Sequence, residues 1–367
     1  MAFLFKRNPK NPPELIRALN DQLSKLDYTN DPSSYKKYQD ESSRYLKQIK
    51  NIIYGDDENE PQFDQINQLL SEILITNNLY ILTINLNKLD FDSRKDVIII
   101  YSTLLRRNYI TGINGNGNGI GGLKSMLSSS SSTTLSQQSP PVVDYLLHKK
   151  PEILNILIRG PETPEIGLVC GQILRDCCKF EEINKYIIYN EAFWNFFKYV
   201  ENPMFEIACD SMMTLNDLLT IHKKIIPDFL VLNYENFMNH INNLIKSNNY
   251  VTKRQISKLL KDLVSERSNL QFLQKYCNDY KNLKYTMLLL SEKSKNLQLE
   301  GFHLLKYIIA NPKRLPKINE TLIKNKQNFS EFFKTFDITS FHDSSLIEER
   351  NFIIQQIELL PDKNITQ

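Results

Sequence analysis

Basic side chains recur at helical spacing in the stretch from Tyr250 to Lys284. Arg254, Lys258 and Lys261 are four and three residues apart, so a helix would carry them along one face. Such a face fits a solvated stripe, a groove for nucleic-acid phosphates, or a ridge on which Arg holds a partner's carboxylate through two parallel bonds. The neighbouring acid Asp262 and a net charge of only +3 weaken the nucleic-acid interpretation, which stays open as the alternative.

Other motifs that could carry chemistry are weaker. Residues 117–122 satisfy G-x-G-x-x-G, but a dinucleotide site needs a preceding strand and a following helix, and here a helical run precedes and polyserine follows. The five cysteines are odd in number and lie mostly in apolar runs, which indicates reduced core residues. Cys170, Cys177 and Cys178 lack the further ligands that zinc requires, and the five histidines form no H-x-x-x-H pair. We therefore expect no metal, no cofactor and no enzymatic activity.

The elements that must position these residues repeat along the chain. Successive apolar helical runs carry near their ends a Leu-Arg dipeptide or a close equivalent: Leu105-Arg106, Leu174-Arg175, Leu215-Asn216, Leu260-Lys261 and Leu305-Lys306. The last three steps are 41, 45 and 45 residues, and the first becomes 41 when residues 112–139 are left out. A period of about 40–47 residues without strand signals is typical of armadillo and HEAT arrays. We predict one all-α domain over 1–367, an armadillo/HEAT-like helical-repeat superhelix that winds as a right-handed solenoid.

Three further features complete the expected organisation. Residues 112–139 carry six of the eleven glycines and a serine run, so we expect a disordered insert within one repeat. Residues 328–360 supply Phe and Ile side chains for a C-terminal helical cap. The N-terminus has no signal-like apolar region and no stretch approaches 18 uncharged apolar residues, which favours a cytoplasmic protein without membrane insertion.

Five stretches of the chain carry a resemblance: LDFDSRKDVIIIYSTLLRR (89–107), PEIGLVCGQILRDC (164–177), FFKYVENPMFEIACDS (196–211), NYVTKRQ (249–255) and NLKYTMLLLSEKSKNLQLEGFHLLKYIIANP (282–312). With them the chain resembles the calcium-binding protein 39 (mouse protein 25) family of armadillo-like kinase scaffolds, with fungal members. The resemblance implies a non-catalytic adaptor whose concave face binds and activates sterile-twenty-type protein kinases or pseudokinases. It further implies a signalling network for cell polarity, morphogenesis and cell separation that includes an NDR-type kinase, with the protein concentrated at sites of polarised growth or division. The family name does not imply a calcium site, since no EF-hand loop occurs here.

The resemblance also implies residue roles. One part of the concave face would receive the partner's C-terminal Trp-Glu-Phe-like tail, and another would support a kinase helix. Arg254 and Lys258 would line the tail pocket, and Met287 would form an adaptable apolar wall. The whole candidate partner-binding set, with aromatic contact from the first two members and a charged rim from Arg267, is Phe205, Tyr250, Arg254, Lys258, Arg267, Lys284 and Met287. Two positions depart from the family pattern: Leu270 replaces a usual aromatic residue and Gln172 a usual aliphatic one.

Overall fold

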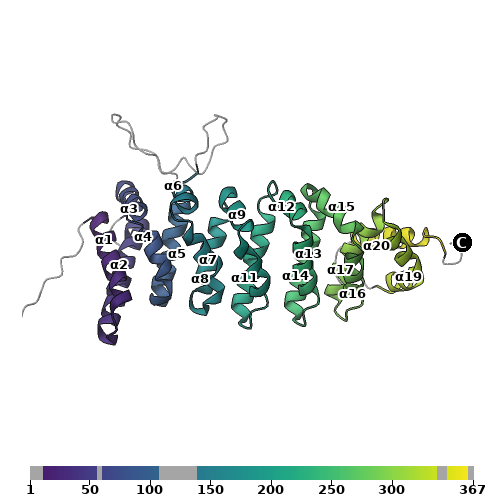
Figure 1. Cartoon of the computed structure of the whole chain (residues 1–367), viewed down its shortest axis with the longest axis horizontal. Helices are drawn as coiled ribbons and strands as arrows, with labels where there is room; N and C mark the ends of the chain where they lie inside the picture. Colours follow the sequence, from purple (N-terminus) through teal and green to yellow (C-terminus); the bar gives the residue numbers. More distant parts are fainter. Residues whose placement is uncertain (1–10, 56–59, 107–138, 337–344, 363–367) are drawn as a thin grey trace, which may run out of the picture. The chain divides into compact units, whose positions relative to one another are not determined.

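The computed structural model describes residues 11–55, 60–106, 139–336 and 345–362. Within these ranges every regular element is a helix, and the helices form two compact units, Met1–Phe193 and Trp194–Gln367 (Figure 1). The all-α helical-repeat prediction is confirmed. The G-x-G-x-x-G run at 117–122 and residues 112–138 of the predicted insert lie outside the described residues, as do 337–344 of the predicted cap. One domain over 1–367 stays a prediction.

The first unit starts with two capped helices. The Asn11 side chain accepts a hydrogen bond from the Glu14 amide at 3.0 Å, and Asp31 accepts one from the Ser34 amide at 2.8 Å. Each cap precedes a proline, which suits the first turn of a helix because its missing N–H would have no partner there. The helices of this unit are α1 (Pro12–Tyr28), α2 (Pro32–Tyr54), α3 (Phe63–Ile75), α4 (Asn78–Ile84), α5 (Phe91–Arg106), α6 (Pro141–Asp144), α7 (Glu152–Ile158), α8 (Pro164–Cys177) and α9 (Glu181–Ile188). Among them α5 packs between α2 and α8.

The second unit carries the basic stretch. Its helices are α10 (Phe196–Tyr199), α11 (Phe205–Thr220), α12 (Ile226–Leu232), α13 (Tyr234–Ile245), α14 (Tyr250–Ser265), the 3-10 turn η5 (Arg267–Asn269), α15 (Leu270–Asn278), α16 (Tyr280–Leu290), α17 (Lys295–Ala310), α18 (Pro316–Lys324), α19 (Lys326–Thr335) and α20 (Ser345–Glu358). Helices α19 and α20 pack on each other, and α20 also packs on α17. They occupy the described part of the region for which a C-terminal cap is predicted.

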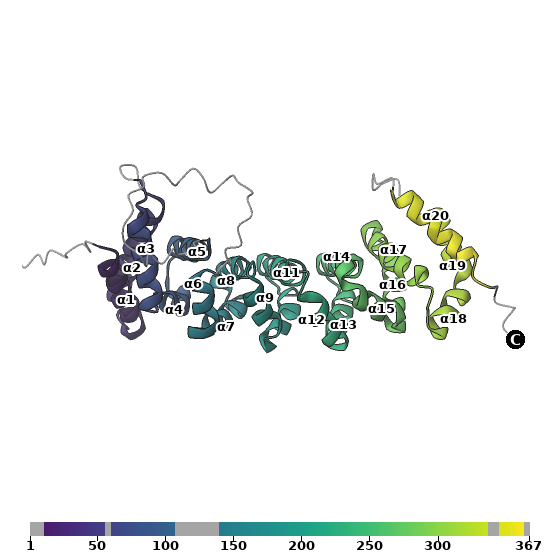
Figure 2. The ribbon, with the colours of Figure 1, turned by 90° about the horizontal axis from the view of Figure 1, so that it is seen from above.

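The repeat is most regular in three helices of this unit. Helices α11, α14 and α17 each have 16 residues, and they begin at Phe205, Tyr250 and Lys295, which are 45 residues apart. α14 packs against both of the others, so the three lie side by side (Figure 2). The Asn249 side chain fixes the start of α14, because its Oδ1 accepts from the amides of Val251 at 2.9 Å and Thr252 at 3.3 Å.

The cysteines lie where the apolar runs place them. Cys170, Cys177, Cys178 and Cys277 are buried, and Cys209 is partly exposed. Burial raises the pKa of Cys277 to about 12 and also raises the pKa of Cys177. Both thiols are therefore protonated at neutral pH and pack as small core residues. No described helix combines the length and apolar character needed to cross a membrane.

Candidate functional site

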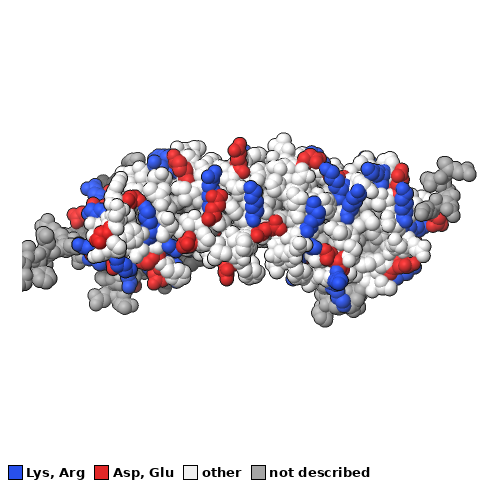
Figure 3. Space-filling view, turned by 60° about the horizontal axis from the view of Figure 1, so that its bottom comes forward, with Lys and Arg blue, Asp and Glu red and all other residues white. Residues whose placement is uncertain are grey.

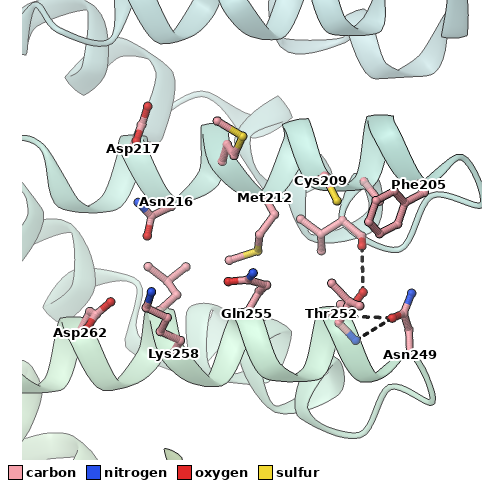
Figure 4. A pocket seen from close by; sticks show the side chains of 15 residues that line it. Phe205, Cys209, Met212, Asn216, Asp217, Asn249, Thr252, Gln255, Lys258 and Asp262 are labelled. Carbon is pink, nitrogen blue, oxygen red and sulfur yellow. Dashed lines mark hydrogen bonds between the residues drawn. The ribbon is translucent and has the colours of Figure 1, made fainter. Parts of the chain in front are cut away.

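A groove of about 530 Å³ runs between α11 and α14 (Figure 4). One wall is a face of α11 whose lining residues follow one another at steps of three or four positions. The other wall is the side of α14 that faces α11. Because both helices begin at the same end of the groove, their side chains meet in rows along its length. The lining residues are Val200, Phe205, Ala208, Cys209, Met212, Met213, Asn216, Asp217, Asn249, Val251, Thr252, Gln255, Lys258, Leu259 and Asp262.

The α11 wall exposes large apolar side chains to solvent. Phe205 is 62% exposed and Met213 is 58% exposed, and Met212 between them is partly exposed. Exposed apolar groups gathered in a concave surface are typical of binding sites, because a partner that covers them removes apolar area from water. Methionine side chains also adapt their shape to different occupants. The α11 wall is therefore suited to the apolar face of a peptide or protein segment.

The α14 side carries the predicted basic stripe. Tyr250, Arg254 and Lys258 follow one another at successive turns, and all three are exposed. The Tyr250 hydroxyl accepts hydrogen bonds from Ser294 Oγ and Asn296 Nδ2, each at 3.4 Å, and the Ser294 bond is the largest cause of the lowered pKa of Tyr250. These bonds tie the start of α14 to the start of α17. In Figure 3, Lys and Arg side chains outnumber acids on the visible face over the α14–α17 part of this unit.

Acidic neighbours engage only some of the α14 cations. Lys253 pairs with Glu292, and Lys261 pairs with Asp262. Arg254 and Lys258 form no ion pair with any residue in the described ranges. The predicted face of Arg254, Lys258 and Lys261 thus divides into two cations that are open to a partner and one that is already paired.

A buried carboxyl group lies beside this stripe. Glu300 of α17 is 9% exposed, and its Oε2 has no hydrogen-bond partner among the described residues. Burial raises the pKa of Glu300, while the positive charges of Lys261, Arg254 and Lys258 oppose that shift, in this order. The Glu300 carboxyl group therefore sits within electrostatic reach of the open cations.

The remaining candidate residues lie on other elements. Arg267 is exposed in η5, whereas Lys284 (exposed) and Met287 (partly exposed) belong to α16. The Lys284 ammonium lies over the Tyr280 ring, 4.9 Å from its centre. The α11–α14 groove is lined by Phe205 and Lys258 of the candidate set and by none of these three. Phe205 and Lys258 thus share the groove, while Tyr250 and Arg254 lie at the preceding turns of α14.

The two departures from the family pattern are both at the surface. Gln172 is exposed on α8 of the first unit, and Leu270, the first residue of α15, is 57% exposed. Neither residue lines the groove.

Sequence reasoning missed several groove residues. Met212, Gln255 and Asp217 line the groove, and Figure 4 shows Met212 and Gln255 facing each other near its centre. Phe205, Met212 and Asn216 are spaced so that they share one face of α11, and this spacing could have indicated one wall of the groove. The spacing does not identify the helix that forms the opposite wall, which is known only from the packing of α11 on α14.

The described residues contain no group of three or more His, Cys, Asp or Glu side chains placed to hold a metal ion. The described residues thus form a helical-repeat protein with an open groove that presents apolar and charged side chains together.

The chain belongs to the Mo25-like family, whose model matches residues 3–361. It is 36% identical to a human protein named "Calcium-binding protein 39-like", over 96% of each chain. It is 33% identical to the "Mo25-like protein" of Schizosaccharomyces pombe, over 98% of this chain and 100% of that one. It is 32% identical to the "Conidiophore development protein hymA" of Emericella nidulans, over 100% of this chain and 95% of that one. The family and its repeat fold are of the scaffold type.

Proposed function

We propose that the chain is a non-catalytic scaffold that binds and allosterically activates a sterile-twenty-type protein kinase or pseudokinase. The α14 stripe and the α11–α14 groove are its binding surface. One observation carries this proposal: the open cations Arg254 and Lys258 stand beside a groove with exposed apolar side chains. Such a surface suits a protein segment that presents both a carboxylate and apolar groups.

Activation without catalysis follows from differential affinity. A scaffold that binds only the closed, active-like state of a kinase draws the population toward that state. Moving the equilibrium from 1:99 to 99:1 requires a preference of about 10⁴-fold, or about 5.5 kcal/mol. A few charge-assisted contacts together with an apolar groove can supply a preference of that size.

The finer assignments belong to the same proposal. The partner's Trp-Glu-Phe-like C-terminal tail would use Arg254 and Lys258, with Arg267, Lys284 and Met287 contributing from η5 and α16. The cellular role would be a network for polarity, morphogenesis and cell separation that includes an NDR-type kinase. The name of the Emericella nidulans relative, which refers to conidiophore development, supports the morphogenetic part. We place the protein in the cytoplasm, concentrated at sites of polarised growth or division.

Nucleic-acid binding is the alternative function. It draws on the basic side chains over α14–α17, but Asp217 and Asp262 line the same groove, and carboxylates repel phosphates. A salt titration separates the two functions. Affinity for nucleic acid falls steeply and linearly on a log–log plot against salt, whereas a peptide groove tolerates moderate salt.

The deciding assay is the turnover of a bound partner kinase at saturating ATP, with and without this chain. We expect the chain to raise turnover and to consume no ATP alone. Unchanged turnover of a kinase that binds would leave only a tethering role. ATP consumption that follows the protein's elution peak in gel filtration would contradict the non-enzymatic assignment. A Met213→Glu variant tests the role of the groove. A charge on its apolar wall should abolish the rise in kinase turnover without disturbing the core, because Met213 is exposed.

A further inference from the structure

The α11–α14 groove continues past its charged end into a second hollow. This hollow has a volume of about 290 Å³ and shares Asn216 and Asp262 with the groove, so the two adjoin. The other residues that line the hollow are Leu219, Thr220, Lys223, Ile226, Leu263, Glu266, Ser268 and Asn269. The joined groove is therefore apolar near the start of α11 and polar near the end of α14.

Two carboxylates stand where the groove becomes polar. Figure 4 shows Asp217 on α11 and Asp262 on α14 at the same end of the groove, with Phe205 at the opposite end. Asp217 forms no ion pair with any described residue, and one oxygen of Asp262 is engaged by Lys261. An unpaired carboxylate in a partly enclosed site favours a cationic ligand.

A buried amide oxygen adds a second and independent acceptor. Asn269 lines the hollow and is 2% exposed. Its Nδ2 donates to the Leu263 carbonyl oxygen at 2.9 Å, while its Oδ1 has no hydrogen-bond partner among the described residues. A buried acceptor without a donor costs free energy, so a ligand that brings N–H groups would be stabilised there.

The cations of the joined groove do not cancel this preference. Lys223 is engaged by Glu266 at 2.6 Å, and Lys261 is engaged by Asp262. Lys258 also lines the groove and forms no ion pair with a described residue. Asp217 and the Asn269 Oδ1 are the acceptors of this end that have no partner among the described residues.

We propose that the Asp217–Asp262–Asn269 end of the groove is a subsite for an arginine or lysine side chain of the partner. The occupant is a segment whose apolar side chains cover Met212 and Met213 and whose cation lies one helical turn further along. Met213 and Asp217 are four residues apart on α11, which corresponds to about 6 Å. The inference rests on the proposed function only in taking this groove as the partner's binding surface.

The test uses the full chain and two blocked synthetic peptides. Both peptides are short amphipathic helices with leucines on one face, and they differ only in carrying Arg or Glu one turn beyond the leucines. The methyl resonances of Met212 and Met213 report binding. We expect the Arg peptide to bind at least about tenfold more tightly than the Glu peptide. The preference should fall below about twofold in Asp217→Asn and in Asp262→Asn.

Two variants act as controls, and each is checked for unchanged thermal unfolding. Glu320→Gln removes one negative charge from an exposed position of α18 in the same unit and should keep the preference for the Arg peptide. Lys224→Ala removes one positive charge from an exposed position outside the candidate set and should also keep the preference. Equal affinity of the two peptides would overturn the inference, and so would a preference that survives both Asp→Asn variants or an absence of methyl shifts with either peptide. If the chain fails to activate a kinase that binds it but still prefers the Arg peptide, only the proposed function is contradicted.

Discussion

Gln255 and Glu300 occupy equivalent positions in two neighbouring repeat helices. Each is the sixth residue of its helix, and the two lie 45 residues apart on α14 and α17, which pack together. Gln255 is exposed and lines the groove, whereas Glu300 is buried beside the basic stripe. The same repeat position is thus a neutral groove residue in one helix and a buried acid in the next.

This buried acid predicts a pH dependence of stability. Burial raises the folded-state pKa of Glu300 above its ordinary value of 4.5, so the folded chain holds this proton more tightly than the unfolded chain does. Its contribution to the free energy of unfolding therefore decreases as pH rises from the unfolded pKa through the folded pKa, and it is constant above that window. In Glu300→Gln this decrease should be absent.

Urea unfolding at a series of pH values measures the difference between Glu300→Gln and the unaltered chain. The difference in free energy of unfolding should grow in favour of the variant as pH rises from the ordinary value of 4.5 through the raised folded pKa of Glu300. The matched variant Glu320→Gln, at an exposed position, should show no such trend. A pH-independent difference for Glu300→Gln would mean that the neighbouring cations fully offset the burial.

A second prediction concerns the packing of the first unit. Gly160 lies so close to α8 that a Cβ atom placed on it would overlap the Cβ and Sγ atoms of Cys170. Gly160→Ala should therefore lower the free energy of unfolding by about 1–3 kcal/mol, as overpacking of a core does. Gly301→Ala is the graded comparison, because its Cβ would stand 3.0 Å from Leu289 Cβ and needs a smaller adjustment. Equal stability of both variants and the unaltered chain in urea would contradict this account.

The sequence predicted the repeat because its signal is local and periodic. Leu215, Leu260 and Leu305 follow one another at intervals of 45 residues, and the first residues of α11, α14 and α17 have the same interval. The shared face of Arg254, Lys258 and Lys261 was predictable for the same reason, since steps of four and three residues keep side chains on one face of a helix.

The opposing wall of the groove was not predictable in this way. Which face of α11 meets α14 depends on the packing of residues about 45 positions apart, and spacing within one helix does not determine it. The pairing of Lys261 with the adjacent Asp262 depends on side-chain conformation in the same way. Met287 and Lys284 are grouped with Arg254 only by resemblance; they belong to α16 and do not line the α11–α14 groove, and their role stays a prediction.

The last prediction tests the stripe itself. Arg254→Ala should weaken the binding of a C-terminal Trp-Glu-Phe peptide by about 2 kcal/mol or more, roughly thirtyfold, because a charge-assisted bond to a carboxylate is lost. The thermal unfolding temperature should barely change, since Arg254 is exposed and forms no ion pair with the described residues. Isothermal titration calorimetry measures the affinity. Lys224→Ala, an exposed cation of the same unit outside the candidate set, is the matched control and should bind as the unaltered chain does. If Arg254→Ala binds the peptide with unchanged affinity, the carboxylate-binding role of the stripe is wrong.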